Sequence, residues 1–275
     1  MGIGVTGAYG AVHAGPVPDA PARRSAVGRN LLVTVGLAIV LGAAARVIEL
    51  RPLELARDVG NIGVFLRGYL HPSFAHIGEY AWQCVVTVSI ALWGTVLALA
   101  ISVPLGLLGA RNLAPHPAVY FVARRGMDVL RAVNEFVFAL MFVTAVGLGP
   151  FAGMLALGVH TGGVLGKLLS ETIEAIDPGQ VEGVAAVGAG RLHVIAFGVA
   201  PQVMPNFISY ILLRFESDIR SASVIGMVGG GGIGFYLWDT IRSFNDREAA
   251  TVILLIVAMV MCIDLVSARI RRAAI

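Results

Sequence analysis

Long apolar stretches without charge recur along the chain, with polar segments between them. Residues 30–45 and 80–110 contain no charged side chain, and a helix needs about 20 apolar residues to cross the core of a bilayer. Four further apolar segments carry only a few charges. We therefore predict an all-α membrane protein with about six transmembrane helices, in residues 30–45, 80–110, 118–146, 151–174, 203–228 and 249–267.

The start of the fifth span depends on two prolines. Residues 192–213 are uncharged, but Pro201 and Pro205 lie in the middle of this stretch. A proline inside a helix removes a backbone hydrogen bond and clashes with the preceding turn. We therefore expect this span to begin near Val203 rather than at the start of the uncharged stretch.

The polar segments divide the chain into three parts. Residues 1–29 are rich in Gly, Pro and Ala and are expected to form a disordered cytoplasmic tail. Residues 30–74 are expected to hold the first transmembrane helix and an extracytoplasmic segment. Residues 75–275 then form the main membrane domain.

The distribution of charge orients the predicted spans. The segments 49–80 and 226–248 each carry a net charge of −1. In contrast, three Arg lie in the N-terminal tail, three at the C-terminus, and three in the loop after the second span together with the start of the third helix. Loops rich in Lys and Arg stay in the cytoplasm. We therefore expect both termini and the loop formed by residues 175–205 to be cytoplasmic.

The overall composition excludes several classes of protein. Hydrophobic residues make up 57% of the chain and charged residues 13%, about half the usual share of roughly 25%. A soluble globule of this length needs more polar surface, and a disordered chain needs more charge. The 20 Lys and Arg form no basic run, so no nucleic-acid partner is expected. Cys84, Cys262 and the His residues show no metal-binding spacing, so no metal site is expected.

The loop of residues 175–205 carries the most specific motif. Glu182, Gly188 and Pro201 fall at the spacing of the signature E-A-A-x3-G-x9-I-x-L-P, which is found in a cytoplasmic loop of type I ABC importer permeases. The loop therefore resembles that family. It departs from the signature at four positions, which are Gly183, Val184, Gly198 and Ala200.

Further segments narrow the resemblance to the phosphonate ABC transporter permease family. It covers roughly residues 75–272, and the segments that carry it are 135–136, 147–153, 160–163, 165–171, 214–221 and 228–234. The resemblance implies a bacterial plasma-membrane permease for phosphonate-, phosphate- or phosphite-type anions. It also implies three kinds of partner: a second permease subunit, giving a homodimer, two ABC ATPase subunits, and an extracytoplasmic binding protein.

The resemblance assigns a role to the loop as well. A short coupling helix in it would dock on the ATPase, and the residues carried over for this role are Glu182, Ala185, Ala186, Gly188 and Pro201. The chain contains no GxxxxGK[ST] motif, so it shows no phosphate-binding loop for ATP. We therefore expect no cofactor in this chain, and ATP and Mg in the partner ATPase.

Charged residues within the predicted spans allow two interpretations. Opposite charges four residues apart can neutralise each other, and the sequence offers Arg131–Glu135, Lys167–Glu171, Arg214–Asp218 and Glu216–Arg220. Alternatively, an Arg faces the translocation pathway and attracts an oxyanion. For that second interpretation the candidates are Arg214 and Arg220, followed by Ser221, Ser223, Glu135, His160 and Lys167.

Two glycine patterns complete the candidate features. The run Gly229, Gly230, Gly231, Gly232 and Gly234 formally fits a dinucleotide fingerprint, but it lies between two spans and not in a βαβ unit. We expect it to form a gate or to line a cavity, where irregular backbone is tolerated at membrane depth. Glycines spaced through residues 149–166 predict close helix packing, which we expect within one subunit.

Three alternative functions remain open at this point. The first is another type I importer permease, for methionine or a different small solute. It would have the same signature loop but different residues along the translocation pathway. An ion-coupled secondary transporter would explain paired intramembrane charges, but no inverted repeat is evident. An intramembrane enzyme would need a catalytic constellation, and none is recognisable. We therefore expect a transporter subunit and not an enzyme.

Overall fold

The computed structural model describes residues 23–51, 54, 57 and 59–274, and all the secondary structure in them is helical. The chain forms two compact units, Met1–Gly63 and Val64–Ile275. Five helices are long and apolar enough to cross a membrane, or six if one bent pair counts as a single span. The prediction of an all-α protein with about six spans is confirmed.

The first unit contains helix α1 (Arg23–Val47), whose segment Asn30–Val47 has the length and hydropathy of a membrane span. The expected disordered tail falls on residues 1–29, of which 1–22 lie outside the described residues. Residues 23–29 are helical, so the expectation was wrong for them. The helix can extend this far because Pro21 is the last proline before it.

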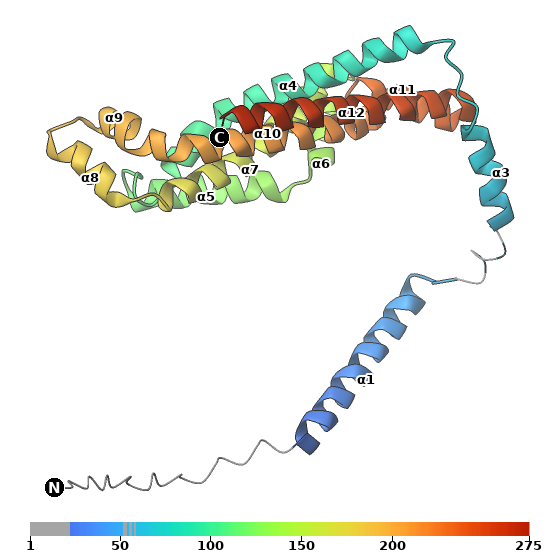
Figure 1. Ribbon diagram of the computed structural model, residues 1–275, viewed down its shortest axis with the longest axis horizontal. Coiled ribbons are helices and arrows are strands. Elements are labelled where there is room, and N and C mark those ends of the chain that lie inside the picture. Colours follow the sequence, from blue (N-terminus) through green and yellow to red (C-terminus); the bar gives the residue numbers. More distant parts are fainter. Residues whose placement is uncertain (1–22, 52–53, 55–56, 58, 275) are drawn as a thin grey trace, which may run out of the picture. The chain divides into compact units, whose positions relative to one another are not determined.

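The second unit carries most of the helices. In chain order, with η1 a π-helical turn and η2 a 3-10 turn, they are α3 (Val59–Tyr69, which begins in the first unit), α4 (Ile77–Leu108), α5 (Pro117–Ala132), α6 (Glu135–Val146), α7 (Pro150–Glu174), α8 (Pro178–Ala186), α9 (Arg191–Val194), η1 (Ile195–Val199), α10 (Ala200–Ile225), η2 (Gly226–Val228), α11 (Ile233–Arg242) and α12 (Asp246–Ala274). Figure 1 shows α4, α7, α10 and α12 running side by side, and α4 and α7 share the most extensive contact.

The contact between α4 and α7 depends on the glycines of α7. A Cβ atom on Gly158 would lie 2.5 Å from Cδ2 of Leu97, and one on Gly162 would lie 3.0 Å from Cβ of Ile101. The absent side chains therefore let the two helices approach closely. Both contacts lie within one chain, which confirms the expected packing role of this glycine pattern.

The third predicted span is broken in the structure. The sequence predicted one helix over 118–146, but α5 and α6 meet at an angle of 88°. Val133 adopts an extended conformation, and the side chain of Asn134 accepts a hydrogen bond from the backbone N–H of Phe136 at 2.9 Å. Asn134 thus caps a new helix, as Asn commonly does, and ends the preceding one.

The fifth span starts earlier than predicted. Helix α10 begins at Ala200 and follows directly on the π-helical turn η1, with Pro201 in its first turn and Pro205 inside it. A first-turn proline has no intrahelical bond to lose, and the π turn accommodates the altered hydrogen-bonding pattern. The prolines therefore shape the start of the span without breaking it.

A further helix, α11, lies in the segment 226–248, where the sequence predicted no helix. It is held to the start of α4 by the hydroxyl of Tyr236, which donates a hydrogen bond to Glu79 at 2.7 Å. That bond raises the pKa of Tyr236. The helix is short and amphipathic, so a search for long apolar stretches does not detect it.

Candidate functional site

The signature loop, residues 175–205, forms a helix–turn–helix whose first helix is α8. Asp177 caps α8 by accepting a hydrogen bond from the backbone N–H of Gly179 at 2.9 Å, and Pro178 occupies the first turn. Gly188 follows the helix with a φ of +78°, and its N–H donates to the carbonyl of Ala185 at 3.0 Å. Residues with a Cβ atom rarely adopt this left-handed conformation, so the glycine of the motif sets the turn.

Gln202 and Arg191 fix the loop to the helical bundle. The side-chain oxygen of Gln202 accepts from the backbone N–H of Asp177 at 3.1 Å, and its amide nitrogen donates to the carbonyl of Gly198 at 2.8 Å. Arg191 donates to the carbonyl of Leu113 at 2.8 Å, in the loop between α4 and α5. The sequence analysis missed both residues, because their partners are distant in sequence.

Gly198 explains one departure from the signature, which has Ile at that position. A Cβ atom on Gly198 would lie 3.2 Å from Cα of Val181. Helix α8 therefore packs so closely on the π-helical turn that a large side chain has no room there. The departure follows from this packing and leaves the turn at Gly188 unchanged.

The signature residues are open to the surface. None of the residues of α8 is buried, and Glu182 makes no ion pair with any described residue. Val187 and Leu192 are 83% and 80% exposed on the same loop. Exposed apolar side chains beside an unpaired acid are typical of a surface that docks on another protein. The exposed signature residues are Glu182, Ala185, Ala186, Gly188 and Pro201.

A buried ionic network joins α4, α7 and α10. Asp218 is fully buried and accepts hydrogen bonds from Thr161 at 2.8 Å and from Thr95 at 3.4 Å. Arg214 lies 3.3 Å from the Asp218 carboxylate and also donates to the Thr161 hydroxyl at 3.1 Å. A charge in such a place requires a partner, and Asp218 has three. Nε of Arg214 is buried without a hydrogen-bond partner among the described residues.

A second polar cluster holds the break between α5 and α6. Ser221 donates to Glu135 at 2.9 Å, and Nε2 of His160 lies 3.5 Å from the other carboxylate oxygen. Nδ1 of His160 is 2.9 Å from the carbonyl of Val133, so this nitrogen carries the proton of the hydrogen bond. The candidates Glu135, His160 and Ser221 therefore lie together, on three different helices.

Two of the four expected ion pairs are confirmed and two are wrong. Arg214 pairs with Asp218 at 3.3 Å, and Lys167 lies 3.9 Å from Glu171 while also binding Asp128 at 3.1 Å. The 88° break separates Arg131 from Glu135, which turns into the bundle. Glu216 and Arg220 instead reach α12, where they pair with Arg271 at 2.6 Å and Asp264 at 3.6 Å, respectively.

The remaining pathway candidates do not converge on one surface. Arg214 and Arg220 lie roughly 120° apart around α10, given 3.6 residues per turn. Arg214 therefore faces the bundle core and Arg220 faces α12. Ser223 donates to the carbonyl of Ile219 at 3.1 Å, which satisfies its hydroxyl within the helix. A role in the pathway remains a prediction for each of these residues.

The glycine-rich segment packs tightly inside the second unit. Gly229, Gly231 and Gly232 have φ values of +97°, +78° and +76°. The carbonyl of Gly229 accepts from the N–H of Gly149 at 2.9 Å, in the turn before α7. Gly230 and Gly234 are buried against neighbouring backbone with no space for a side chain. Glycine is thus required for both conformation and packing, and the expected gate or cavity role stays a prediction.

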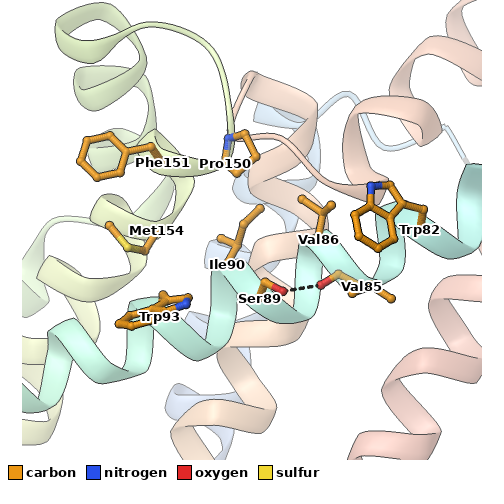
Figure 2. Close-up of a pocket in the computed structure, with 9 residues that line it drawn as sticks. All are labelled: Trp82, Val85, Val86, Ser89, Ile90, Trp93, Pro150, Phe151 and Met154. Carbon is orange, nitrogen blue, oxygen red and sulfur yellow. Dashed lines mark hydrogen bonds between the residues drawn. The ribbon is translucent and has the colours of Figure 1, made fainter.

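An apolar pocket of about 330 Å³ lies between α4 and the start of α7 (Figure 2). Trp82, Trp93 and Phe151 contribute large exposed surfaces to it. Its one hydroxyl, that of Ser89, donates to the carbonyl of Val85 at 2.8 Å and is not free for a ligand. The other polar groups of the lining are the indole N–H groups of Trp82 and Trp93, and no charged side chain lines the pocket.

Comparisons with known proteins place the chain among transport proteins. The sequence profile of the family described as "Binding-protein-dependent transport system inner membrane component" matches residues 102–274. The chain is 36% identical over 240 residues to the phosphite transport system permease protein PtxC of Stutzerimonas stutzeri, covering 87% of each chain. It is 37% identical over 249 residues to the phosphate-import permease protein PhnE of Mycolicibacterium smegmatis. That match covers 88% of this chain but only 47% of the relative, so the chain spans about half the relative's length.

A solved structure supports the fold. The chain resembles a chain of the MetNI methionine ABC transporter in an inward-facing conformation, with a TM-score of 0.65 and 18% identity over 74% of this chain and 99% of that one. The profile match confirms the resemblance noted from the sequence, and it confirms a multi-pass inner-membrane transporter subunit and not an enzyme. The chain belongs to the family of binding-protein-dependent transport system inner membrane components.

Proposed function

We propose that this chain is the permease subunit of an ATP-driven importer for phosphite-, phosphonate- or phosphate-type anions. The observation that carries the proposal is the 36% identity to a phosphite permease over 87% of both chains. The likeness to the methionine transporter supports the fold alone, because the identity there is 18%. A substrate with a tetrahedral phosphorus oxyanion therefore fits the relatives best.

The signature loop would couple this subunit to an ATPase. Helix α8 is short and capped, and Gln202 of α10 binds its capping residue. A displacement of α8 by the ATPase would therefore be transmitted to α10. The exposed residues of α8, Glu182 among them, would dock on the partner. ATP and Mg would bind in that partner, and two such ATPase subunits would serve two permease subunits, with identical chains forming the pathway at their interface.

The proposed orientation has both termini and the signature loop in the cytoplasm. The bond from Arg191 to the carbonyl of Leu113 supports it, because it joins the signature loop to the loop after α4 and so places both at the same end of the bundle. The orientation was assigned from the charges of the termini and of the region after the second span, and the signature loop follows on the same side from the number of spans between them. An extracytoplasmic binding protein would then deliver the anion at the opposite end of the bundle.

Uptake in cells tests the substrate class. We would measure uptake of labelled phosphate and phosphite in cells with and without the gene, after removal of other phosphate importers, and add unlabelled phosphonates or methionine as competitors. We expect uptake to depend on the gene, with phosphonate or phosphite competing and methionine without effect. Gene-dependent uptake of methionine, with no uptake of phosphorus anions, would replace this proposal with its main alternative.

A further inference from the structure

Arg131, at the end of α5, stands apart from the other cations of the bundle. It is exposed, and no carboxylate among the described residues lies within ion-pair distance of it. Five other cations of the bundle are paired with acids: Arg124, Lys167, Arg214, Arg220 and Arg271. Arg247, Arg269 and Arg272 also form no ion pair with a described residue, but they lie toward the ends of α12. The break between α5 and α6 causes the difference, because it directs Glu135 away from Arg131 and into the bundle.

Arg131 also lies far from both ends of the bundle, although its side chain is exposed. A Cβ atom on Gly163 would be 3.1 Å from the backbone nitrogen of Arg131, so the two residues are in direct contact. Gly163 lies near the middle of α7, roughly 17–20 Å from either end of that helix at a rise of about 1.5 Å per residue. An arginine side chain reaches only about 7 Å from its Cα atom, given bonds of about 1.5 Å. Arg131 therefore cannot place its charge at either end of α7.

An unpaired charge at this depth must have a polar environment. A charged side chain near the centre of a bilayer is costly and almost always faces a water-filled cavity or another charged group. Non-helical backbone at this depth, such as that of Val133 and Asn134, occurs where protein or a cavity covers it. In transporters, interrupted helices of this kind form substrate sites near the midplane.

Hydrogen bonds hold the break between α5 and α6 in place, so the backbone next to Arg131 has a fixed position. His160 binds the carbonyl of Val133 at 2.9 Å, Ser221 binds Glu135 at 2.9 Å, and Asn134 caps α6. Glu135, four residues further along the chain, is thereby kept from neutralising Arg131. Asp128, which lies one turn from Arg131 and interacts with its charge, is already bound by Lys167 at 3.1 Å and by Arg125 at 3.3 Å. A guanidinium that has a fixed backbone and no carboxylate within ion-pair distance is suited to bind a ligand anion.

We propose that Arg131 is an anion contact in the translocation pathway and binds two oxygens of a phosphorus oxyanion. Its planar fork of N–H groups matches two oxygens of a phosphonate, phosphite or phosphate, whereas Lys would supply a point charge. This inference rests on the proposed function and names a residue for it. It assigns the contact to Arg131 in place of Arg214 and Arg220, which already have protein partners.

Cysteine labelling tests the position of Arg131 without reference to transport. In a background with Cys84 and Cys262 replaced by Ala, we would compare Arg131→Cys with Val129→Cys. Val129 lies on the same helix at nearly the same depth, is exposed, and points roughly 200° away. In proteoliposomes with the partner subunits, a membrane-impermeant anionic methanethiosulfonate should react at position 131 at least tenfold faster than at 129. Equal or absent labelling of the two variants would overturn the inference.

Protection by ligand separates a pathway anion from a lipid headgroup. Methylphosphonate, added with the binding protein and ATP, should slow the labelling of Ala132→Cys, an exposed neighbour that leaves Arg131 in place, in vesicles of phosphatidylcholine. If methylphosphonate has no effect, or if only added phosphatidylglycerol slows labelling, the anion contact is wrong. Protection without any wild-type uptake of phosphorus anions would support the contact and overturn the proposed import instead.

Transport by charge variants provides the second test. Uptake of phosphite should fall at least tenfold in Arg131→Gln and less in Arg131→Lys, which keeps the charge. The matched control is Arg125→Gln on the same helix, whose Arg is exposed and already paired with Asp128 at 3.3 Å, and it should retain uptake within twofold. Full uptake by Arg131→Gln, in a wild type that imports phosphite, would overturn the inference and leave the proposed function standing.

Discussion

The buried network around Asp218 makes a strong prediction about stability. Thr161→Val keeps the volume of the side chain but removes the hydroxyl that donates to Asp218 at 2.8 Å and accepts from Arg214 at 3.1 Å. A hydrogen bond to a charged group contributes about 1.5–3 kcal/mol. Because this hydroxyl is fully buried and no other described group replaces it, we expect Thr161→Val to lower the free energy of unfolding by about 2–4 kcal/mol.

Removing the charge of Asp218 should cost more. Asp218→Asn keeps the shape but leaves Arg214 without its counter-ion, and breaking a buried ion pair costs about 3–5 kcal/mol. Replacing both partners by apolar residues, as in Arg214→Met with Asp218→Leu, removes both charges. The double variant should therefore recover much of the lost stability, which is the opposite of additive behaviour.

Thermal unfolding of the purified protein in detergent measures these effects. For a chain of this size, each kcal/mol shifts the unfolding midpoint by about 2–4 °C, so Asp218→Asn should lower it by roughly 6–20 °C. The control is Thr144→Val, an exposed residue whose hydroxyl bonds only to its own helix, and its midpoint should hardly change. If Asp218→Asn and Thr161→Val unfold at the same temperature as Thr144→Val, the network does not stabilise the bundle.

Two further predictions concern glycines. Gly188→Ala should uncouple ATP hydrolysis from uptake by straining the turn at φ +78°, at a cost of about 1–2 kcal/mol, whereas Gly183→Ala, in open space within α8, should couple normally. Equal ratios of ATP hydrolysed to substrate imported in the two variants would contradict this. Gly158→Val should destabilise the protein by about 1–3 kcal/mol through overpacking against Leu97, and Gly126→Val, which meets no neighbour, provides the control in thermal unfolding.

The sequence predicts the long spans and the turn of the signature loop well. The charge-free stretch 30–45 lies within α1, and the stretch 80–110 makes up most of α4. Both could be predicted because a bilayer span is set by a local property, the length of the apolar run. Gly188 is also local, since its positive φ directly requires glycine. Features fixed by adjacent residues can therefore be read from the sequence.

The break at Val133 and the partners of the charged residues could not be predicted in the same way. Apolar residues flank the break on both sides, and its one local signal is Asn134 followed by Glu135, a helix-capping pattern inside an apparent span. Glu216 and Arg220 have the right spacing to pair with each other, yet both reach α12. The spacing of charged residues along one helix does not show which neighbouring helix their side chains contact.

The central claim is that this chain forms the membrane pathway of an ATP-driven importer of phosphorus oxyanions. Its most direct test is phosphite uptake into proteoliposomes that contain the purified permease with its ATPase, with the binding protein present on the side opposite the ATPase. We expect uptake that requires ATP and all three components and that methylphosphonate inhibits. Uptake that proceeds without the ATPase and follows an ion gradient, or no uptake of any phosphorus anion by the complete assembly, would contradict the account.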